Sequence, residues 1–369
     1  MTRTKSKRIF IGFGIFITLL VIAAYVNLAP GISFLRTYMN PQAPPAPTIR
    51  QLRIESGTRM IPARLYAPSG SPKGTIVLIH GVHADGYNEK RLMHFTNTLV
   101  DFGFQVVTPD IEDLRKYQIV ERAVTDIRRS ASWVLKNGKI VKKEEKIGLW
   151  GISFAGGLCL SLAGSPEFGG RIASSFSFGG HSDLDATIKY LMTGNTPSGN
   201  RPPHVYGQAV LVRKYAYLLV PNEQKEALQS TVRYYLQGDY DIAKKMSRCL
   251  PPESRRYSRL IFQGDQATLG RLLQRAVSSP NSPASLSAIR NSAPKNAVFL
   301  LHGSMDNVIP PHESQKLATW AEHGSNSVHL LISPLINHVE LEEHSAGNTW
   351  ISYFKIIRFW ANLLRATEN

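Results

Sequence analysis

The chain has 369 residues, 43% of them hydrophobic, and a formal net charge of +16. This length allows one large domain or two smaller ones, and the hydrophobic content is ample for a globular core. The basic excess suits an anionic membrane surface or an anionic substrate. Nucleic-acid binding is not expected, because the sequence has no finger or basic-zipper spacing and no basic helix with interleaved aromatic residues. The two cysteines, Cys159 and Cys249, exclude a disulfide-rich scaffold and a multi-cysteine metal site.

The amino-terminal segment is first basic and then apolar. Residues 1–8 carry four basic side chains, and no charged residue lies between Ile9 and Leu35. Residues 9–29 are predicted to form a membrane anchor, since a span needs about 20 mostly apolar residues. A cleaved signal peptide is the alternative, but its apolar core of about 7–15 residues is shorter than this one, and no good Ala-x-Ala site follows. The basic residues favour a single-pass topology with a cytoplasmic amino terminus and an extracytoplasmic body.

A proline-rich linker is predicted between this anchor and the folded body. Pro30 and Gly31 favour the end of the span, and four prolines lie from Pro41 to Pro47. Because proline restricts the backbone to extended conformations, residues 30–48 are assigned to a stiff linker.

Eight segments are predicted to be β-strands, because they are continuously apolar or alternate between apolar and polar residues. They are Gln51–Ile54, Met60–Tyr66, Thr75–Ile79, Phe104–Thr108, Ile147–Trp150, Ser174–Phe178, Val298–Leu301 and Val328–Ile332. Segments with helical spacing lie between several of these strands. The alternation predicts an α/β fold with a mostly parallel central sheet and helices on both faces.

Residues 184–294 interrupt this alternation. They contain helix-like pieces, many tyrosines and frequent helix breakers, and the sheet pattern resumes after them. We expect a mainly helical cap above the carboxyl edge of the sheet, where open α/β sheets bind ligands. Its basic residues Arg201, Arg213 and Lys214 suggest anionic substrates as a further hypothesis. The chain is expected to end in an amphipathic helix with one apolar side, formed by Trp350, Phe354, Ile357, Trp360 and Leu364.

The functional interpretation depends on the segment Lys146–Gly157. An apolar run ends at Gly151, Ser153 follows between small residues, and the apolar residues after Gly157 are typical of a buried helix. A serine at such a strand–turn–helix junction has a strained backbone and a hydroxyl exposed above the sheet. The pattern differs from Gly-x-Ser-x-Gly at its last position, Ala155, which is still small. The alternative is a glycine-rich helix start that carries no chemistry.

Three further motifs follow predicted strands: His80-Gly81-Val82, the loop His302–Pro310 with Asp306, and Asn337-His338-Val339. Together with the turn at Ser153 they occur in the order serine, acid, histidine. With these four motifs the chain, over about residues 50–365, resembles the α/β-hydrolase superfamily and, more loosely, dienelactone-hydrolase-like proteins. The resemblance implies an α/β-hydrolase fold whose core comprises residues 49–183 and 295–369, with the cap at residues 184–294 between them.

The resemblance also implies a role for each motif. Ser153 is expected to be the nucleophile, His338 the base that takes its proton, and Asp306 the acid that orients the histidine. The backbone N–H groups of Val82 and Phe154 are expected to form the oxyanion hole. This chemistry needs neither a cofactor nor a metal ion, so none is expected.

Two other carboxylates are candidates for the acid. Asp183 and Asp185 both follow the strand before the insertion. We favour Asp306, because its loop leads directly to the histidine segment, and because triads are identified by role and position.

Other histidines are alternatives to His338. His344 is one, but it is expected to lie in or near the last helix. His80 and His302 are expected to support loops through hydrogen bonds. Three further histidines are too dispersed in the sequence for a metal site: His83, His181 and His312.

The sequence therefore predicts a membrane-anchored serine hydrolase that cleaves an ester or a related acyl bond. Acyl transfer, thioester cleavage and peptide cleavage on the same triad are alternatives, since the fold does not decide among them. A non-catalytic anchored binding module is the alternative of a different class. The expected partners are a small-molecule acyl substrate and the membrane, with no obligate protein partner.

Overall fold

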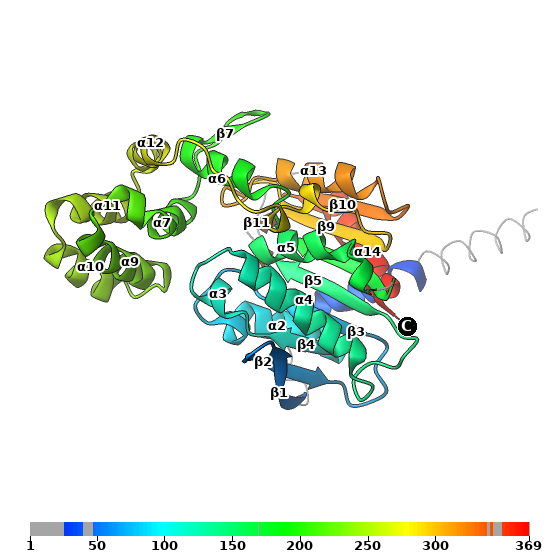
Figure 1. The fold of residues 1–369 in the computed structure, drawn as a ribbon. Helices are drawn as coiled ribbons and strands as arrows, with labels where there is room; N and C mark the ends of the chain where they lie inside the picture. Colours follow the sequence, from blue (N-terminus) through cyan, green and yellow to red (C-terminus); the bar gives the residue numbers. More distant parts are fainter. Residues whose placement is uncertain (1–25, 40–46, 169, 338–339, 342–348, 369) are drawn as a thin grey trace, which may run out of the picture.

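The computed structural model describes residues 26–39, 47–168, 170–337, 340–341 and 349–368. An eight-stranded sheet forms its centre (Figure 1). In spatial order the strands are β1 (Thr48–Ser56), β2 (Arg59–Ala67), β4 (Gln105–Pro109), β3 (Thr75–Ile79), β5 (Ile147–Ile152), β6 (Ile172–Phe178), β9 (Ala297–Gly303) and β10 (Val328–Ser333). β2 runs antiparallel to β1 and β4, and the other neighbours are parallel.

This strand order, with the sharp turn that follows β5 at Ser153, confirms the predicted α/β-hydrolase fold. Each of the eight predicted strands is present, although the observed ends differ by a few residues. Every residue of β3 and β4 is buried, as expected for central strands that are covered on both faces.

Helices cover both faces of the sheet. On the first face lie α4 (Glu121–Lys136), α5 (Phe154–Ala163) and α13 (His312–Ala321), and on the second lie α2 (Lys90–Asp101) and α14 (Thr349–Thr367). Side chains of one strand alternate between the faces: in β3, Val77 and Ile79 belong to the first cluster, and Ile76 and Leu78 belong to the second. The connections contain the short elements η1 (Gly86–Asn88), α3 (Glu112–Arg115) and η2 (Pro166–Phe168).

The insertion between β6 and β9 is mainly helical, as predicted. Figure 1 shows most of its helices grouped beyond one end of the sheet. Its elements are α6 (Leu184–Thr193), β7 (Asn195–Thr196), β8 (Gly199–Asn200), α7 (Val205–Lys214), α8 (Ala216–Leu219), α9 (Asn222–Leu236), α10 (Tyr240–Cys249), α11 (Pro252–Gln263), α12 (Gln266–Ala276), η3 (Ala284–Leu286) and η4 (Ala288–Arg290).

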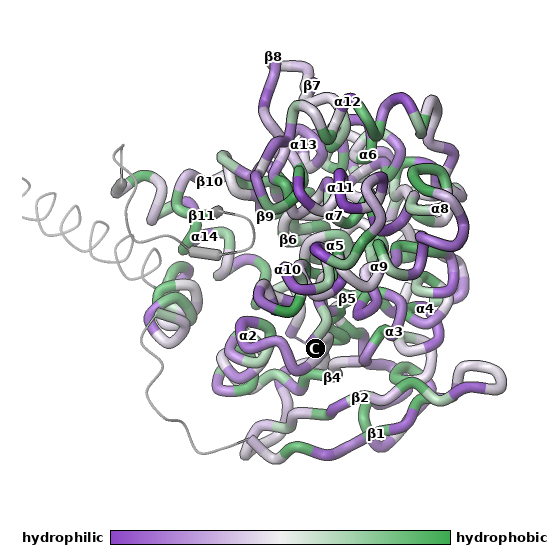
Figure 2. The backbone as a smooth tube through the Cα atoms, turned by 90° about the vertical axis from the view of Figure 1, so that its left-hand side faces the viewer, coloured by the Kyte–Doolittle hydropathy of each residue, from purple (hydrophilic) through white to green (hydrophobic). Residues whose placement is uncertain are grey.

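Residues 26–39 form a helix that packs on the second face of the sheet. Figure 2 shows it beside α2 and α14. The Phe34 ring lies 4.4 Å from the Trp360 ring of α14 and 6.2 Å from the Phe95 ring of α2. A Cβ atom at Gly31 would lie 2.0 Å from the carbonyl oxygen of Ile357, so the two helix backbones are in direct contact there. The folded body therefore includes a segment that precedes residue 49.

The helix continues through Pro30 and Gly31, where the sequence predicts the end of the membrane span. Proline cannot donate to the carbonyl of the residue four positions earlier, which here is Val26. The Arg365 side chain donates to that carbonyl at 3.2 Å and also to the carbonyl of Asn27. Gly31 permits the close contact with α14. Pro30 and Gly31 therefore fit within a packed helix, and residues 30–39 of the predicted linker are helical.

Most of the predicted anchor, residues 9–29, lies outside the described residues. Among the helices that the structure does describe, none combines the length and the apolar character that a membrane crossing requires.

The predicted apolar side of α14 is buried only in part. Trp360 and Leu364 are buried against the sheet, as expected. Trp350 and Phe354, near the start of α14, are 88% and 51% exposed. The sequence pattern gives the face of a helix correctly, but it does not show how far along its length the helix is covered.

The contact at Gly31 leads to a stability prediction. In Gly31→Ala the new Cβ would meet a backbone atom of Ile357 that cannot rotate away. We expect the free energy of unfolding to fall by about 1–3 kcal/mol, measured by thermal or denaturant unfolding of the full-length protein in detergent. Gly138→Ala is the control, since a Cβ at exposed Gly138 meets nothing within 4 Å. If Gly31→Ala and Gly138→Ala had the same free energy of unfolding, the packing of the helix at residues 26–39 on α14 would be contradicted.

Candidate active site

Ser153 lies at the apex of the turn between β5 and α5, and its backbone is strained. Its φ of 55° and ψ of −134° place it outside the regions that non-glycine residues ordinarily occupy. The Ser153 N–H donates to the carbonyl oxygen of Phe178 at 2.7 Å, which ties the turn to the end of β6. The structure thus places Ser153 in the strained turn that the sequence predicted.

Small residues around Ser153 are required by close contacts. A Cβ at Gly151 would lie 2.4 Å from the carbonyl oxygen of Ala155, and a Cβ at Gly156 would lie 2.3 Å from the Ser177 hydroxyl oxygen. Ala155 itself is fully buried. The turn therefore accepts alanine at the position where the common pattern has glycine, whereas the neighbouring glycines have no room for a side chain.

The predicted oxyanion loop lies directly beside this turn. A Cβ at Gly81 would lie 3.4 Å from the Cβ of Ser153. The His80 ring fixes the loop, with Nδ1 2.7 Å from the carbonyl oxygen of Gly81 and Nε2 accepting from the Ile111 N–H at 2.9 Å. Burial lowers the pKa of His80, although the bond to Gly81 opposes this. His80 thus has the supporting role predicted for it.

A tyrosine of the cap also holds the oxyanion loop. The hydroxyl of Tyr206, on α7, donates to the carbonyl oxygen of Val82 at 2.9 Å. Burial raises the pKa of Tyr206, so its proton stays available for this bond. Val82 and Phe154, whose N–H groups are the predicted oxyanion donors, both line the cavity that contains Ser153.

Asp306 is fully buried in the loop that follows β9. Its Oδ1 accepts from the backbone N–H groups of Val308 at 2.8 Å and Ile309 at 3.0 Å. Its Oδ2 lies 3.2 Å from Nε2 of His302. His302 also contacts the carbonyl oxygen of Ile309 at 2.8 Å and the Ser314 hydroxyl at 2.6 Å. His302 therefore supports this loop, as predicted, and is absent from the lining of the Ser153 cavity.

The cap holds the acid loop as well. The Arg201 guanidinium donates to the carbonyl oxygens of Ser304 at 3.0 Å and Asp306 at 2.9 Å. The Tyr190 hydroxyl donates to the carbonyl oxygen of Asn307 at 3.0 Å. Arg201 thus binds protein carbonyl groups, which weakens the hypothesis that it recognises an anionic substrate.

His338 and the alternative His344 lie outside the described residues. The preceding chain can be followed to β11 (Ile336–Asn337), which pairs antiparallel with β12 (Glu340–Leu341). Ile336 lines the same cavity as Ser153. The segment that leads to His338 therefore reaches the cavity, and the role of His338 as the base stays a prediction.

The two alternative acids have structural partners elsewhere. Asp183 caps α6, where it accepts from the Asp185 N–H at 2.8 Å, and Arg290 lies 3.0 Å from its Oδ2. Asp185 accepts from the Ser282 N–H at 2.9 Å and pairs with Arg290 at 2.9 Å. None of the three carboxylates lines the cavity around Ser153. The two alternatives differ from Asp306 in that both are paired with Arg290.

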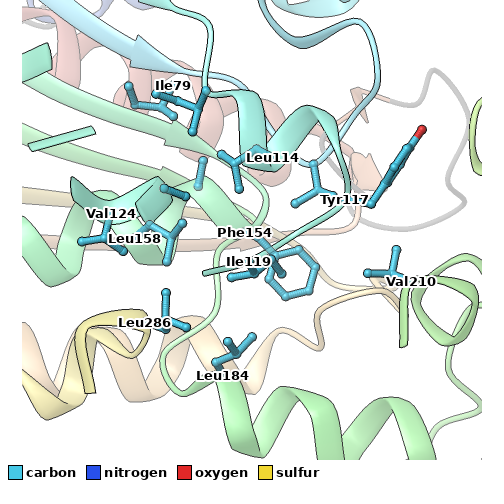
Figure 3. Packing of buried hydrophobic residues seen from close by; sticks show 14 of the residues in the cluster. Ile79, Leu114, Tyr117, Ile119, Val124, Phe154, Leu158, Leu184, Val210 and Leu286 are labelled. Carbon is cyan, nitrogen blue, oxygen red and sulfur yellow. The ribbon is translucent and has the colours of Figure 1, made fainter. Parts of the chain in front are cut away.

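The cavity has a volume of about 440 Å³ and is lined by the strand ends, by the cap and by helices on the second face of the sheet. Figure 3 shows the Phe154 ring among Ile119, Leu184 and Val210, so the turn and the cap share one apolar surface. Lys214 also lines the cavity, and burial lowers its pKa, although Asp185 opposes this. Of the three basic cap residues noted in the sequence, only Lys214 lines it.

No metal site is evident in the part of the chain that the structure describes, because no three histidine, cysteine or acidic side chains there are grouped to hold an ion. His181 is buried, and its Nε2 lies 2.8 Å from the carbonyl oxygen of Leu286. Nε2 of His312 lies 3.3 Å from Oε1 of Glu313. Glu313 accepts from the Ser182 N–H and hydroxyl. Burial alone would raise the pKa of Glu313, but hydrogen bonds from His312, Ser182 and Lys316 lower it.

Taken together, the geometry suits nucleophilic chemistry. A strained serine faces an apolar cavity, the oxyanion loop lies beside it, and a buried carboxylate lies in a loop that borders the same cavity. Tyr190, Arg201 and Tyr206 hold these loops, and the sequence did not identify that role. Tyrosine and arginine have no local pattern that reveals a partner more than 100 residues away.

Comparisons with known proteins give distant matches. No family model matches the chain. The chain is 23% identical over 284 residues to Lipase 5 of Candida albicans. The match covers 70% of this chain and 56% of that lipase, so the chain spans about half of its relative's length. Among solved structures it is similar to dienelactone hydrolase from Anabaena variabilis, at 13% identity over 88% of this chain and 100% of that one, with a TM-score of 0.46.

A thermophilic carboxylesterase from a metagenomic library is similar at 13% identity, over 91% of this chain and 94% of that one, with a TM-score of 0.49. With TM-scores below 0.5, neither likeness is needed for the fold, which rests on the strand order and the turn at Ser153.

The bond from Tyr206 to Val82 leads to a catalytic prediction. Tyr206→Phe leaves the buried carbonyl of Val82 without its hydrogen-bond donor. The unsatisfied carbonyl lowers the free energy of unfolding by about 1–3 kcal/mol, and the oxyanion loop is held less firmly. We expect kcat on a short p-nitrophenyl ester to fall about tenfold with little change in KM. Tyr235→Phe is the control, since Tyr235 lies elsewhere in the cap, beside Tyr240 and Phe262. Equal kcat in both variants would remove Tyr206 from this role.

Proposed function

We propose that the protein is a serine esterase that cleaves a carboxylic ester through an acyl-enzyme. The observation that carries this proposal is Ser153 itself, whose φ of 55° is maintained at the wall of an apolar cavity beside the oxyanion loop. Strain of about 1–3 kcal/mol in a non-glycine residue persists when the surrounding structure fixes it, and such residues cluster at functional sites. The names of the similar lipase and esterase point to the same class of reaction.

In the proposed reaction the Ser153 hydroxyl oxygen attacks the ester carbonyl carbon while His338 takes its proton. The N–H groups of Val82 and Phe154 stabilise the oxyanion that forms. The carbon–oxygen bond to the alcohol then breaks, and the alcohol leaves with the proton from His338. Water attacks the acyl-enzyme by the same steps and releases the acid. Asp306 holds His338 in the required tautomer throughout.

Other reactions could use the same groups. In acyl transfer, an alcohol or amine replaces water as the group that attacks the acyl-enzyme. Thioester or peptide cleavage differs from ester cleavage only in the leaving group. The lining of the cavity favours an apolar acyl group over a peptide, since most of the side chains that line it are aliphatic or aromatic. A non-catalytic binding module would not need strain at Ser153.

We also propose that residues 9–29 anchor the protein in a membrane, with the body on the extracytoplasmic side. The support is in the sequence: no charge occurs between Ile9 and Leu35, and four basic residues precede that stretch.

The function is tested with a fluorophosphonate probe and a set of p-nitrophenyl esters. Ser153→Ala should abolish labelling and lower kcat by at least about a thousandfold, because the nucleophile is lost. Ser161→Ala on the same helix is the control; its hydroxyl donates to the carbonyl oxygen of Leu158 at 2.8 Å, and it should label normally. A wild-type protein that neither labels nor hydrolyses any ester would favour the binding module.

The anchor is tested by fractionation of cells that express the full-length protein. The protein should stay with membranes after high-salt and carbonate washes, because about 20 apolar residues insert stably. A variant that begins at residue 26 should be released by the carbonate wash. Release of the unmodified protein, with a new amino terminus within residues 24–30, would show a cleaved signal peptide.

A further inference from the structure

The cavity around Ser153 has apolar walls on two sides. One side, which we name the cap arm, is lined by Leu184, Ile188, Leu191, Val210 and Leu211. The other side, the helix arm, is lined by Phe34, Tyr38, Leu92, Phe95, Ile356 and Trp360. The two sets belong to separate hydrophobic clusters, one shared with the cap and the other on the second face of the sheet. A ligand at Ser153 therefore has two apolar directions open to it.

Three helices build the helix arm, and their contacts hold it in place. Phe34 and Tyr38 come from the helix at residues 26–39, Leu92 and Phe95 from α2, and Trp360 from α14. The Tyr38 ring lies 6.4 Å from the Phe95 ring, and Nε2 of His94 lies 2.7 Å from the Tyr38 carbonyl oxygen. About one turn before Phe34, the contact of Gly31 with Ile357 holds the same helix against α14. The helix before residue 40 is thus a fixed wall of the cavity.

The chemistry of the helix arm favours a hydrocarbon chain. Its lining is aromatic and aliphatic. Two charged residues that line the cavity near the start of α2 are paired with each other, since the Arg91 guanidinium donates to Glu89 at 2.7 Å, and Glu89 also accepts from the Leu92 N–H at 2.9 Å. A polar substrate group placed in the arm would lose its hydration, whereas an alkyl chain would remove apolar surface from water.

Two of these helices also carry large apolar side chains that are exposed. Ile32 is 42% exposed on the helix at 26–39, and Trp350 and Phe354 are 88% and 51% exposed on α14. Residues 9–25, which lead into the first of these helices, contain no charge. Exposed apolar groups gathered on adjoining elements are typical of surfaces that meet lipid or a partner. A lipid is therefore the source of an alkyl chain that best fits these surroundings.

We propose that the helix arm binds the distal part of a long unbranched acyl chain, and that the substrate is a long-chain lipid ester. This inference rests on the proposed esterase function and names its substrate class. A cavity of about 440 Å³ lies in the usual range for ligand sites of about 300–1,000 Å³. Each CH₂ that enters the arm raises kcat/KM by up to about fourfold, which corresponds to about 0.8 kcal/mol.

The test uses the full-length protein in detergent and p-nitrophenyl esters from acetate to palmitate. Leu92→Trp fills the helix arm, and we expect it to lower the laurate-to-acetate ratio of kcat/KM by at least about tenfold, because two or more CH₂ groups are excluded. Ile188→Trp is the matched variant in the cap arm and should leave this ratio within about twofold of the wild-type ratio. Tyr38→Ala enlarges the helix arm and should shift the preferred ester to a longer chain.

Two results would overturn the proposal. In the first, Ile188→Trp lowers the laurate-to-acetate ratio and Leu92→Trp does not, which would place the chain in the cap arm. In the second, wild-type kcat/KM does not rise with chain length. If Leu92→Trp fails to fold, the shift expected for Tyr38→Ala decides the matter alone.

A binding measurement separates this inference from the proposed function. A fluorescent C12 fatty acid should bind wild-type protein, and Leu92→Trp should weaken its Kd by at least about tenfold. Binding of the fatty acid that Leu92→Trp weakens, without hydrolysis of any ester, would contradict the esterase function and support an acyl-chain site in the helix arm. Hydrolysis of p-nitrophenyl acetate without binding of the fatty acid would support the esterase function and contradict an acyl-chain site in the helix arm.

Discussion

The site depends on one constraint, which is the backbone conformation of Ser153. A serine at φ 55° is unfavourable by itself, so the fold must supply what holds it there. The bond from its N–H to Phe178 fixes the turn to β6. At Gly151 and Gly156 the elements β5, β6 and α5 pack so closely around the turn that a side chain has no room. The buried sheet thus maintains the strain, and Ser153 lines the cavity at this turn.

The cap has a second structural role, because it fixes the two loops that complete the site. Tyr206 binds the oxyanion loop at Val82, while Arg201 and Tyr190 bind the acid loop at Asp306 and Asn307. These loops connect elements of the sheet, but the donors that orient them come from α6, α7 and the segment between them. The cap is therefore coupled to the chemistry through hydrogen bonds, in addition to covering apolar surface.

The sequence predicted the sheet well and the long-range contacts poorly, for a physical reason. The burial of strands such as β3 leaves a continuous apolar run that can be recognised locally, and the small residues around Ser153 leave a local pattern as well. The bonds of Arg201 and Tyr206 leave none, since an arginine or tyrosine in a helix-like stretch has the same appearance whether it meets solvent, substrate or a carbonyl group 100 residues away. The same limit applies to α14, whose pattern shows which side is apolar but not that Trp350 is exposed.

Pro30 and Gly31 show why a local signal can mislead. Proline and glycine weaken an isolated helix, so they favour a boundary when only the sequence is considered. In the folded protein Arg365 donates to the carbonyl that Pro30 cannot serve, and Gly31 lets the backbones of two helices touch at Ile357. Tertiary contacts thus offset the cost of both residues. The helix that results brings Phe34 and Tyr38 to the cavity of Ser153, so the chain directly after the proposed anchor forms part of the substrate site.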